Sequence, residues 1–515
     1  MSALTEPYIN IPAQPKIKKP KEYSLTEKIC SFICIILGYF WLDTVLLHGG
    51  RSTGGALFCI ALSLTAFFSM KKSGAAMNRF VIFLFAMSLI FGGNLFITAN
   101  EYAKFASGFS SVTATAMFLL CSSCGYTKPQ PYMGLDLMNA VLKRPFESYS
   151  ETLPAAVSVT RGIKGNNLKN AKYIVWGLLF ALPATAVITI LLSMADSRME
   201  SLVNSIFDFE FIPEEMFSHI VTFVFSLLIS CGIFSLIFSA IRSRKTAGEA
   251  NFLKSTFAET CGKTNGLLVY SAVTPICLIY VIFFFLQADY FLGGFMGNLP
   301  DGQSFSEYAR RGFFELCAVA VINAAIILII NGICEKQNGR PKALKFFTIF
   351  LSASTVLLVA TAMSKMVMYI NEYGYTQKRI YASILMIALA ILFVFVIVKQ
   401  VCEQFNLSMT AFVLTTAMLC VFSFANVDSF IVNENYRLYK SGKIAEFGVT
   451  YYDISADAIP ALDRLARDEN FKEAKNIIIE TGEMLDFLDK YNSIYEENLS
   501  EYMGRMIAEE YVKKS

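Results

Sequence analysis

Three ionisable side chains lie inside otherwise apolar stretches of the sequence, and they are the first candidates for chemistry. Asp43, Glu315 and Lys365 each interrupt a long run of aliphatic and aromatic residues. An ionised group in the hydrocarbon layer of a membrane costs free energy, so such residues usually pair with one another or line a polar path. Because Glu315 and Lys365 lie in consecutive apolar stretches, we expect them at similar depth, where they could form an ion pair.

Further polar residues flank Glu315 on the same expected side of the membrane. Arg310 and Arg311 lie about one helical turn before it, and Gln287 ends the preceding apolar stretch. The structural alternative is that charged side chains near the boundary reach water, and that a Glu–Lys pair merely locks two helices together. The functional interpretation is an outward-opening polar pocket, with the candidate residues Glu315, Lys365, Arg310, Arg311, Gln287 and Asp43.

The remaining reactive residue types form no pattern that indicates catalysis, a cofactor or a metal. The sequence has only two histidines, His48 and His219, and it has no phosphate-binding loop. Its 12 cysteines are scattered through apolar runs, as small packing residues are. Cys121 and Cys124 have the spacing of a redox pair, but no strand–helix context surrounds them, which favours packing. We therefore expect neither an enzyme active site nor a bound cofactor.

The apolar stretches that must position these candidates indicate a membrane protein. Hydrophobic residues make up 55% of the 515 residues and charged residues only 17%, against about a quarter in soluble domains. Since a span needs about 20 mostly apolar residues, the sequence predicts an all-α, polytopic transmembrane helical bundle of about eleven spans. We place them near 31–48, 54–70, 80–98, 105–122, 173–194, 217–240, 264–286, 312–332, 346–370, 381–402 and 408–425. The weakest is 105–122, which Ser and Thr residues dilute.

The basic residues between the spans predict the orientation. The N-terminal tail and the even-numbered loops carry 25 Lys and Arg, counting Lys399 at the end of its span, whereas the odd-numbered loops carry 7. Because positive charge collects on the cytoplasmic side, the N-terminus is predicted to be cytoplasmic and, after eleven spans, the C-terminus extracytoplasmic. The net charge of +3 gives no indication of a nucleic-acid partner. The expected partner is the lipid bilayer of the cell membrane.

The chain is predicted to have five parts. They are a cytoplasmic basic N-tail (1–28), N-terminal transmembrane hairpins (29–122), a cytoplasmic loop (123–172), the main transmembrane bundle (173–425) and a polar helical tail (426–515). In the loop, apolar positions from Leu135 to Leu142, followed by Lys143 and Arg144, are typical of a helix at the lipid headgroups or of one that packs on the bundle. Pro145 is expected to end this helix.

The C-terminal tail has 18 acidic and 11 basic residues and a helical pattern. Ser455 and Asp457 are N-cap candidates for a helix that runs to about Arg467, with Pro460 in its first turn. Apolar spacing predicts two further helices, over 470–482 and 484–512. Together they indicate a small helical C-terminal subdomain.

Three stretches carry a family resemblance. They are 287–294 with 306–316, then Tyr373-Gly374-Tyr375-Thr376 with Arg379, and finally 426–462, which contains Asn426, Asp428, Asn435, Arg437, Ser455, Asp457 and Pro460. The chain resembles the bacterial multi-pass membrane family catalogued as domain of unknown function 4173, or its close neighbour 4153, best over 264–465. The resemblance implies a membrane topology and no particular reaction.

Two functions from different classes fit these features. A non-enzymatic protein that senses or supports the cell envelope would use its spans to hold the tail where it meets a protein partner. A transporter or lipid-handling protein would instead use the polar pocket around Glu315 and Lys365. Deleting residues 465–515 is expected to abolish the first function and to leave transport largely intact.

Overall fold

The computed structural model describes residues 23–47, 52–129, 138–158, 214–243, 266–286, 313–333, 341–469, 471–491 and 498–513, with a few single positions between 185 and 198. All regular structure in these residues is helical, and they contain no β-strand, which confirms the all-α prediction. The predicted span 173–194 lies almost entirely outside the described residues.

Eight helices in this part of the chain are long and apolar enough to cross a membrane. They are Leu25–Leu47, Thr53–Lys72, Glu101–Cys124, Val221–Arg242, Gly266–Leu286, Lys342–Tyr373, Gln377–Val401 and Leu407–Phe424. Two shorter apolar helices, Arg79–Asn94 and Ala318–Gly332, coincide with the third and eighth predicted spans. These helices account for every predicted span except 173–194 and confirm a multi-pass membrane protein.

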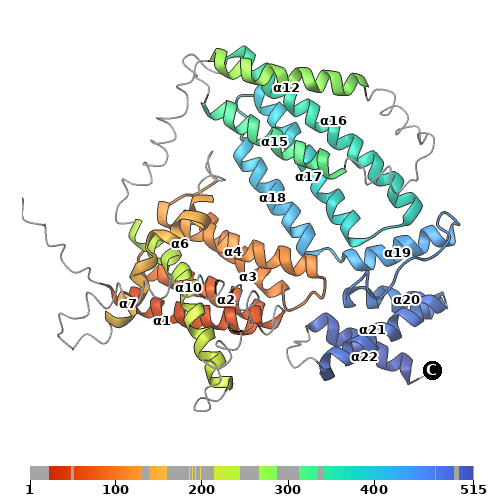
Figure 1. The fold of residues 1–515 in the computed structure, drawn as a ribbon, viewed down its shortest axis with the longest axis horizontal. Helices are drawn as coiled ribbons and strands as arrows, with labels where there is room; N and C mark the ends of the chain where they lie inside the picture. The colour runs from red at the N-terminus through yellow and green to blue at the C-terminus, as the bar shows by residue number, and fades with distance from the viewer. Residues whose placement is uncertain are drawn as a thin grey trace, which may run out of the picture.

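The spanning helices form two groups (Figure 1). The first contains α1 (Leu25–Phe40), α2 (Thr53–Lys72), α3 (Arg79–Asn94), α4 (Glu101–Cys124) and α10 (Glu214–Ser243), and the second contains α12 (Gly266–Leu286), α15 (Phe313–Ile333), α16 (Lys342–Tyr373) and α17 (Gln377–Val401). Helix α18 (Leu407–Phe424) packs on α17 of the second group and on α4 of the first. Each group has its own apolar core, around Phe118 and Phe238 in the first and around Leu351 and Leu358 in the second.

Helix α4 contains the polar stretch that made 105–122 the weakest predicted span, and it is a well-packed helix. Most of its hydroxyl residues are buried, namely Ser107, Ser110, Ser111, Thr115 and Ser122. The Ser111 hydroxyl donates to the carbonyl of Ser88 at 2.7 Å, and Thr115 lies 2.9 Å from the hydroxyl of Ser63. Small hydroxyl residues allow close helix contact and hydrogen bonds in a membrane, so here they strengthen the span instead of weakening it.

The described part of the cytoplasmic loop packs against α10. It contains the π-helix Asn139–Lys143, α6 (Arg144–Glu147) and α7 (Thr152–Val157). The hydroxyl of Ser235 donates to the carbonyl of Arg144 at 2.7 Å and accepts from the backbone N–H of Ser148 at 2.9 Å. The expectation that Pro145 ends a helix is wrong, because it lies in the first turn of α6, where its missing N–H costs no hydrogen bond.

The tail forms four α-helices at one end of the bundle (Figure 1): α19 (Val427–Lys440), α20 (Ile459–Asp468), α21 (Lys472–Tyr491) and α22 (Leu499–Val512). Pro460 lies in the first turn of α20, as predicted. The structure differs from the sequence prediction at two points. Helix α19 was not predicted, and the predicted boundary between the helices 470–482 and 484–512 is wrong, because α21 continues to Tyr491. Their shared core, which includes Val432, Leu462 and Ile478, confirms a folded helical subdomain.

Candidate functional site

The structure describes only part of the predicted polar pocket. Arg310, Arg311 and Gln287 lie outside the described residues, and the side chain of Glu315, in the first turn of α15, does as well. Lys365 is half-buried in the C-terminal half of α16. The pocket therefore stays a prediction.

The packing around Lys365 nevertheless bears on its depth. Leu316, the neighbour of Glu315, packs against the apolar cluster that contains Ala362 and Met366 of α16. These two residues lie on either side of Lys365 in the sequence. The contact brings the first turn of α15 to the C-terminal half of α16, and the ion pair between Glu315 and Lys365 stays a prediction.

Asp43 belongs to a different group of helices. It lies in Trp41–Leu47, where α1 continues as a π-helix. One carboxylate oxygen of Asp43 lies 3.8 Å from Nδ1 of His219 on α10, and the Tyr39 hydroxyl lies 2.8 Å from the same nitrogen. Asp43 thus takes part in a contact with α10 in the first group of helices, whereas Lys365 belongs to α16 of the second group.

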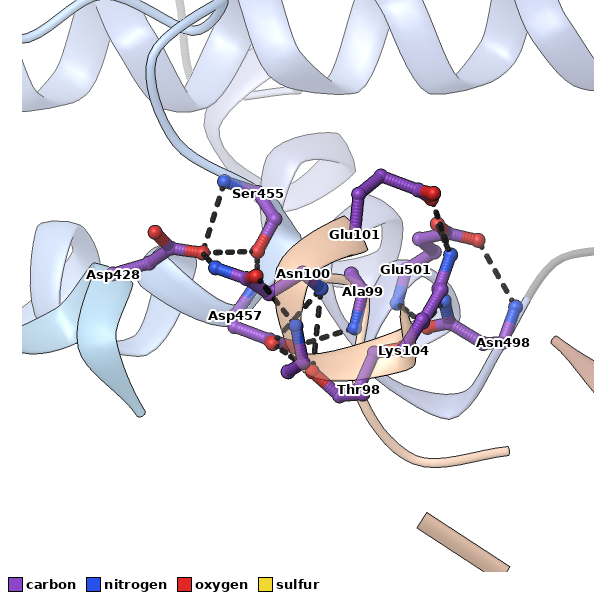
Figure 2. Close-up of polar contacts among 11 residues, drawn as sticks. Thr98, Ala99, Asn100, Glu101, Lys104, Asp428, Ser455, Asp457, Asn498 and Glu501 are labelled. Atoms are coloured by element: carbon purple, nitrogen blue, oxygen red, sulfur yellow. Dashed lines mark hydrogen bonds and ion pairs between the residues drawn. The ribbon is translucent and has the colours of Figure 1, made fainter. Parts of the chain in front are cut away.

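A second polar site joins the tail to the ends of three spanning helices. It is termed the polar junction and consists of Thr98, Asn100, Gln377, Asp428, Ser455 and Asp457. Thr98 and Asn100 lie between α3 and α4, Gln377 begins α17, and the other three residues belong to the tail, which follows α18 directly. Figure 2 shows how the side chains from the tail point towards the connection before α4.

Asp428, in the first turn of α19, is the centre of the junction and is fully buried (0% exposed). One carboxylate oxygen accepts hydrogen bonds from the side-chain amide of Asn100 at 2.9 Å and from the backbone N–H and the hydroxyl of Ser455; the other accepts from the amide of Gln377 at 2.6 Å. Burial raises the pKa of this carboxyl above its usual value, although these hydrogen bonds oppose the shift. Four donors from three parts of the chain therefore depend on one side chain.

Asp457 holds the connection between α3 and α4 from the other side. Its carboxylate accepts from the backbone N–H groups of Ala99 at 2.9 Å and of Asn100 at 3.2 Å, and from the Thr98 hydroxyl at 2.5 Å (Figure 2). A carboxylate near the first N–H groups of a helix is favourable, because these groups have no partner within the helix. Asp457 therefore fixes the start of α4 to the tail.

Helix α22 contacts the same connection. The backbone N–H groups of Leu499 and Ser500 donate to the carbonyls of Phe96 and Ile97, at 3.1 and 3.3 Å. The side-chain amide of Asn498 donates to the Thr98 carbonyl at 3.2 Å. These bonds satisfy carbonyls at the end of α3 with N–H groups at the start of α22.

An ion pair adds to this contact (Figure 2). The ammonium group of Lys104 on α4 lies 3.6 Å from a carboxylate oxygen of Glu501 on α22 and 3.1 Å from that of Glu101. The Lys104 and Glu501 side chains are only 9% and 12% exposed, so solvent screens their attraction less than it screens a surface pair.

A neighbouring contact joins α19 to the turn between α16 and α17. Asn435 is buried; its side-chain oxygen accepts from the backbone N–H of Tyr375 at 2.7 Å, and its amide donates to the Tyr375 carbonyl at 3.0 Å. Gly374 has a φ of +72°, and a Cβ there would lie 2.7 Å from the Asn435 side-chain oxygen. This position requires glycine both for its backbone conformation and for space.

The chemistry of the junction suits a joint between chain segments. The donors that bind Asp428 and Asp457 are neutral amides, hydroxyls and backbone N–H groups. Within the described residues, no group of three or more His, Cys, Asp and Glu side chains is placed to hold a metal ion. The buried Asp428 and the half-buried Asp457, bound in this way, fix the geometry of the chain segments that they join.

Sequence reasoning identified parts of the junction without joining them. Asp428 and Asn435 belong to the stretch that carries the family resemblance, and Asp457 was an N-cap candidate. Asn100 was missed, although an Asn just before the apolar α4 is a typical N-cap, and its side chain does accept from the N–H of Ala103. No local sequence pattern predicts which of these residues contact one another.

The fold and the junction together define a class of protein: a polytopic helical membrane protein whose polar tail is bound to helix ends at one end of the bundle. The chain belongs to the family described as Domain of unknown function (DUF4153), whose model matches residues 30–465. This is the second of the two families that the sequence resembles, so the first, 4173, is replaced, and the match begins well before residue 264. No curated protein and no solved structure matches the chain.

Proposed function

We propose that this protein is a non-enzymatic component of the bacterial cell envelope, in which the spans hold a helical tail where it binds a protein partner on the extracytoplasmic side. The observation that carries the proposal is the buried Asp428, which ties the tail to the connections before α4 and α17. A tail fixed in this way keeps one orientation relative to the membrane. Such a fixed surface is suited to binding, because a partner that binds to it loses little free energy to ordering of the tail.

A groove in the tail supports this proposal. It encloses about 360 Å³ between the segment 445–449 and α21, and its lining includes Tyr439, Phe447 and Ile477. Glu446, Glu473 and Glu480 also line it, and its described lining residues include no Lys or Arg. Aromatic and acidic side chains together favour a basic segment of an envelope protein as the partner.

Transport remains the second candidate, and one observation favours it. Leu316, which follows Glu315, packs against the apolar cluster that contains Ala362 and Met366 on either side of Lys365, and this supports a pocket that both residues share. Intramembrane ionisable residues frequently mark a solute or ion path.

Point variants test the two functions better than a deletion does. Removing 465–515 would expose Leu462 and other members of the tail core, so that loss of function would report unfolding. We would instead disrupt the chromosomal gene in the native host, record the envelope-stress phenotype, and complement it with the double variant Glu473→Lys/Glu480→Lys or with Lys365→Met. The double variant Glu483→Lys/Asp486→Lys is the matched charge control, because both residues are exposed on α21 and neither lines the groove.

Partner binding predicts that the groove variant fails to complement while Lys365→Met and the control succeed. The opposite pattern, with failure of Lys365→Met alone, would overturn the proposal in favour of transport. Membrane abundance of each variant, measured by immunoblot, separates loss of function from loss of protein.

A further inference from the structure

Helix α22 has an apolar stripe that no part of the described chain covers. Leu499, Tyr502, Met503 and Met506 are 42–56% exposed. Their spacing of i, i+3, i+4 and i+7 places them on one face of the helix. A stripe of this kind in water is unfavourable, so it indicates a contact surface.

The opposite face of α22 already has its partners within the tail. Gly504 faces Ile459 of α20, where a Cβ would lie 2.5 Å from the isoleucine Cδ1. Ala508 is buried against Gly482 of α21, with 2.4 Å between its Cβ and the place of a Cβ on that glycine. Since this buried face fixes α22 to the tail, the exposed stripe is not needed for folding of the subdomain.

The start of the stripe lies at the end of a membrane-spanning hairpin. The backbone bond from Leu499 to the Phe96 carbonyl places the first turn of α22 directly on the connection between α3 and α4. Phe96 and Ile97 are themselves exposed and directly follow the apolar helix α3. The stripe therefore begins beside two exposed apolar residues at the end of a helix that is apolar enough for a membrane.

We propose that the stripe of α22 contacts the lipid bilayer at the headgroup boundary beside the α3–α4 hairpin. The stripe extends over eight residues, or about 10 Å along the helix axis at 1.5 Å per residue, so a helix that lies in the plane of the headgroups can place all four side chains about 5–10 Å into this layer. Tyr502 suits the position, because its amphipathic ring favours the membrane–water interface. This contact holds the tail on the membrane in addition to the polar junction.

Four side chains on two helical turns are too few for a stable contact between two copies of the chain, which buries about 800 Å² per partner. Lipid needs no such area, because the hairpin already brings the stripe to the bilayer. The lipid contact does not depend on the proposed partner-binding function, and it would hold equally for a transporter.

Depth-dependent fluorescence quenching tests the proposal in the full-length protein. Tyr502→Trp and Met503→Trp would be compared with Lys513→Trp at the exposed end of the same helix, in phosphatidylcholine vesicles with and without bromine near the headgroup end of the acyl chains. Emission of the parent protein, which has two Trp, is subtracted. Both stripe variants should lose roughly half of their added emission in brominated vesicles, since a ring within about 5–10 Å of the boundary lies next to the quencher. Lys513→Trp should lose little.

Quenching by acrylamide, which dissolves in water, shows whether the stripe faces water instead of lipid. If acrylamide quenches the stripe variants as strongly as Lys513→Trp, the stripe faces water and the proposal is overturned. If neither quencher reaches them, protein covers the stripe, and the proposal is overturned as well. Two neighbouring probes guard against the failure of one variant to fold.

Discussion

Replacing Asp428 by Ala is the most direct perturbation of the junction. The change leaves four donors without their acceptor, namely the amides of Asn100 and Gln377 and the N–H and hydroxyl of Ser455. An unsatisfied buried donor costs about 1–3 kcal/mol, but the Ser455 hydroxyl can rotate and water can enter the space. We therefore expect a loss of about 3–5 kcal/mol in the free energy that holds the tail on the bundle.

A loss of this size should be visible as local opening. At about 1.4 kcal/mol per factor of ten, the undocked population rises by a factor of at least about a hundred. Hydrogen exchange of α19 and α20, followed by mass spectrometry on the protein in lipid nanodiscs, should show faster exchange in Asp428→Ala. The spanning helices α2 and α16 should keep their protection, because the junction lies beyond their ends.

The matched control is Asp453→Ala. Asp453 also accepts a side-chain hydrogen bond, from the Thr450 hydroxyl at 2.6 Å, but it is exposed, so its loss should change the free energy by no more than about 0.5 kcal/mol. If Asp428→Ala and Asp453→Ala exchange at the same rate as the unmodified protein, the junction does not hold the tail, and the argument from burial fails.

Three further predictions follow from particular residues. Gly374→Ala should lower the free energy of unfolding by about 2–4 kcal/mol, because strain at positive φ adds to a clash with Asn435. In the control Gly442→Ala the φ is similar, at +69°, but the space around the residue is open, so the loss should be only about 1 kcal/mol. Equal losses in thermal unfolding experiments would contradict the clash. Because burial raises the pKa of Asp428 in the folded protein, the pH-dependent part of its contribution to docking is fully present below the ordinary pKa of about 3.9 and is lost as the pH rises through the folded pKa, whereas its hydrogen bonds as an acceptor remain. Asp428→Asn should flatten the pH dependence of tail protection above about pH 4, and an unchanged slope would assign it to other groups. A cysteine in place of the exposed Tyr452 should react with a membrane-impermeant maleimide on intact cells, whereas one in place of the exposed Lys128 should react only after permeabilisation; the reverse pattern would invert the topology.

The spanning helices could be predicted because their signal is local. Length and apolarity alone identify α16 or α17, and a single proline in a first turn, such as Pro460, identifies the start of α20. The polarity of α4 was misjudged for a physical reason: Ser111 and Thr115 weaken a span that faces lipid but strengthen one that faces other helices. Which case applies depends on the neighbours, and these are known only from the fold.

The junction could not be predicted because its partners are distant in sequence. Asn100 and Asp428 are separated by 328 residues, and each has an adequate local explanation, the first as a helix cap and the second as an acidic residue in a first turn. Asp43, Glu315 and Lys365 attracted attention because a charge in an apolar stretch is conspicuous. Asp428 lies in a polar stretch, where only the structure reveals that it is buried.

The contacts of the helix ends also bear on the number of spans. Arg144 joins the end of α4 to the C-terminal half of α10, since its side chain lies 3.4 Å from the Ser123 hydroxyl and its carbonyl accepts from Ser235. Helices α4 and α10 thus end on the same side of the bundle, and each must have entered from the other. This relation between α4 and α10 agrees with the predicted span near 173–194, which lies outside the described residues and stays a prediction, as does the side of the membrane on which the tail lies.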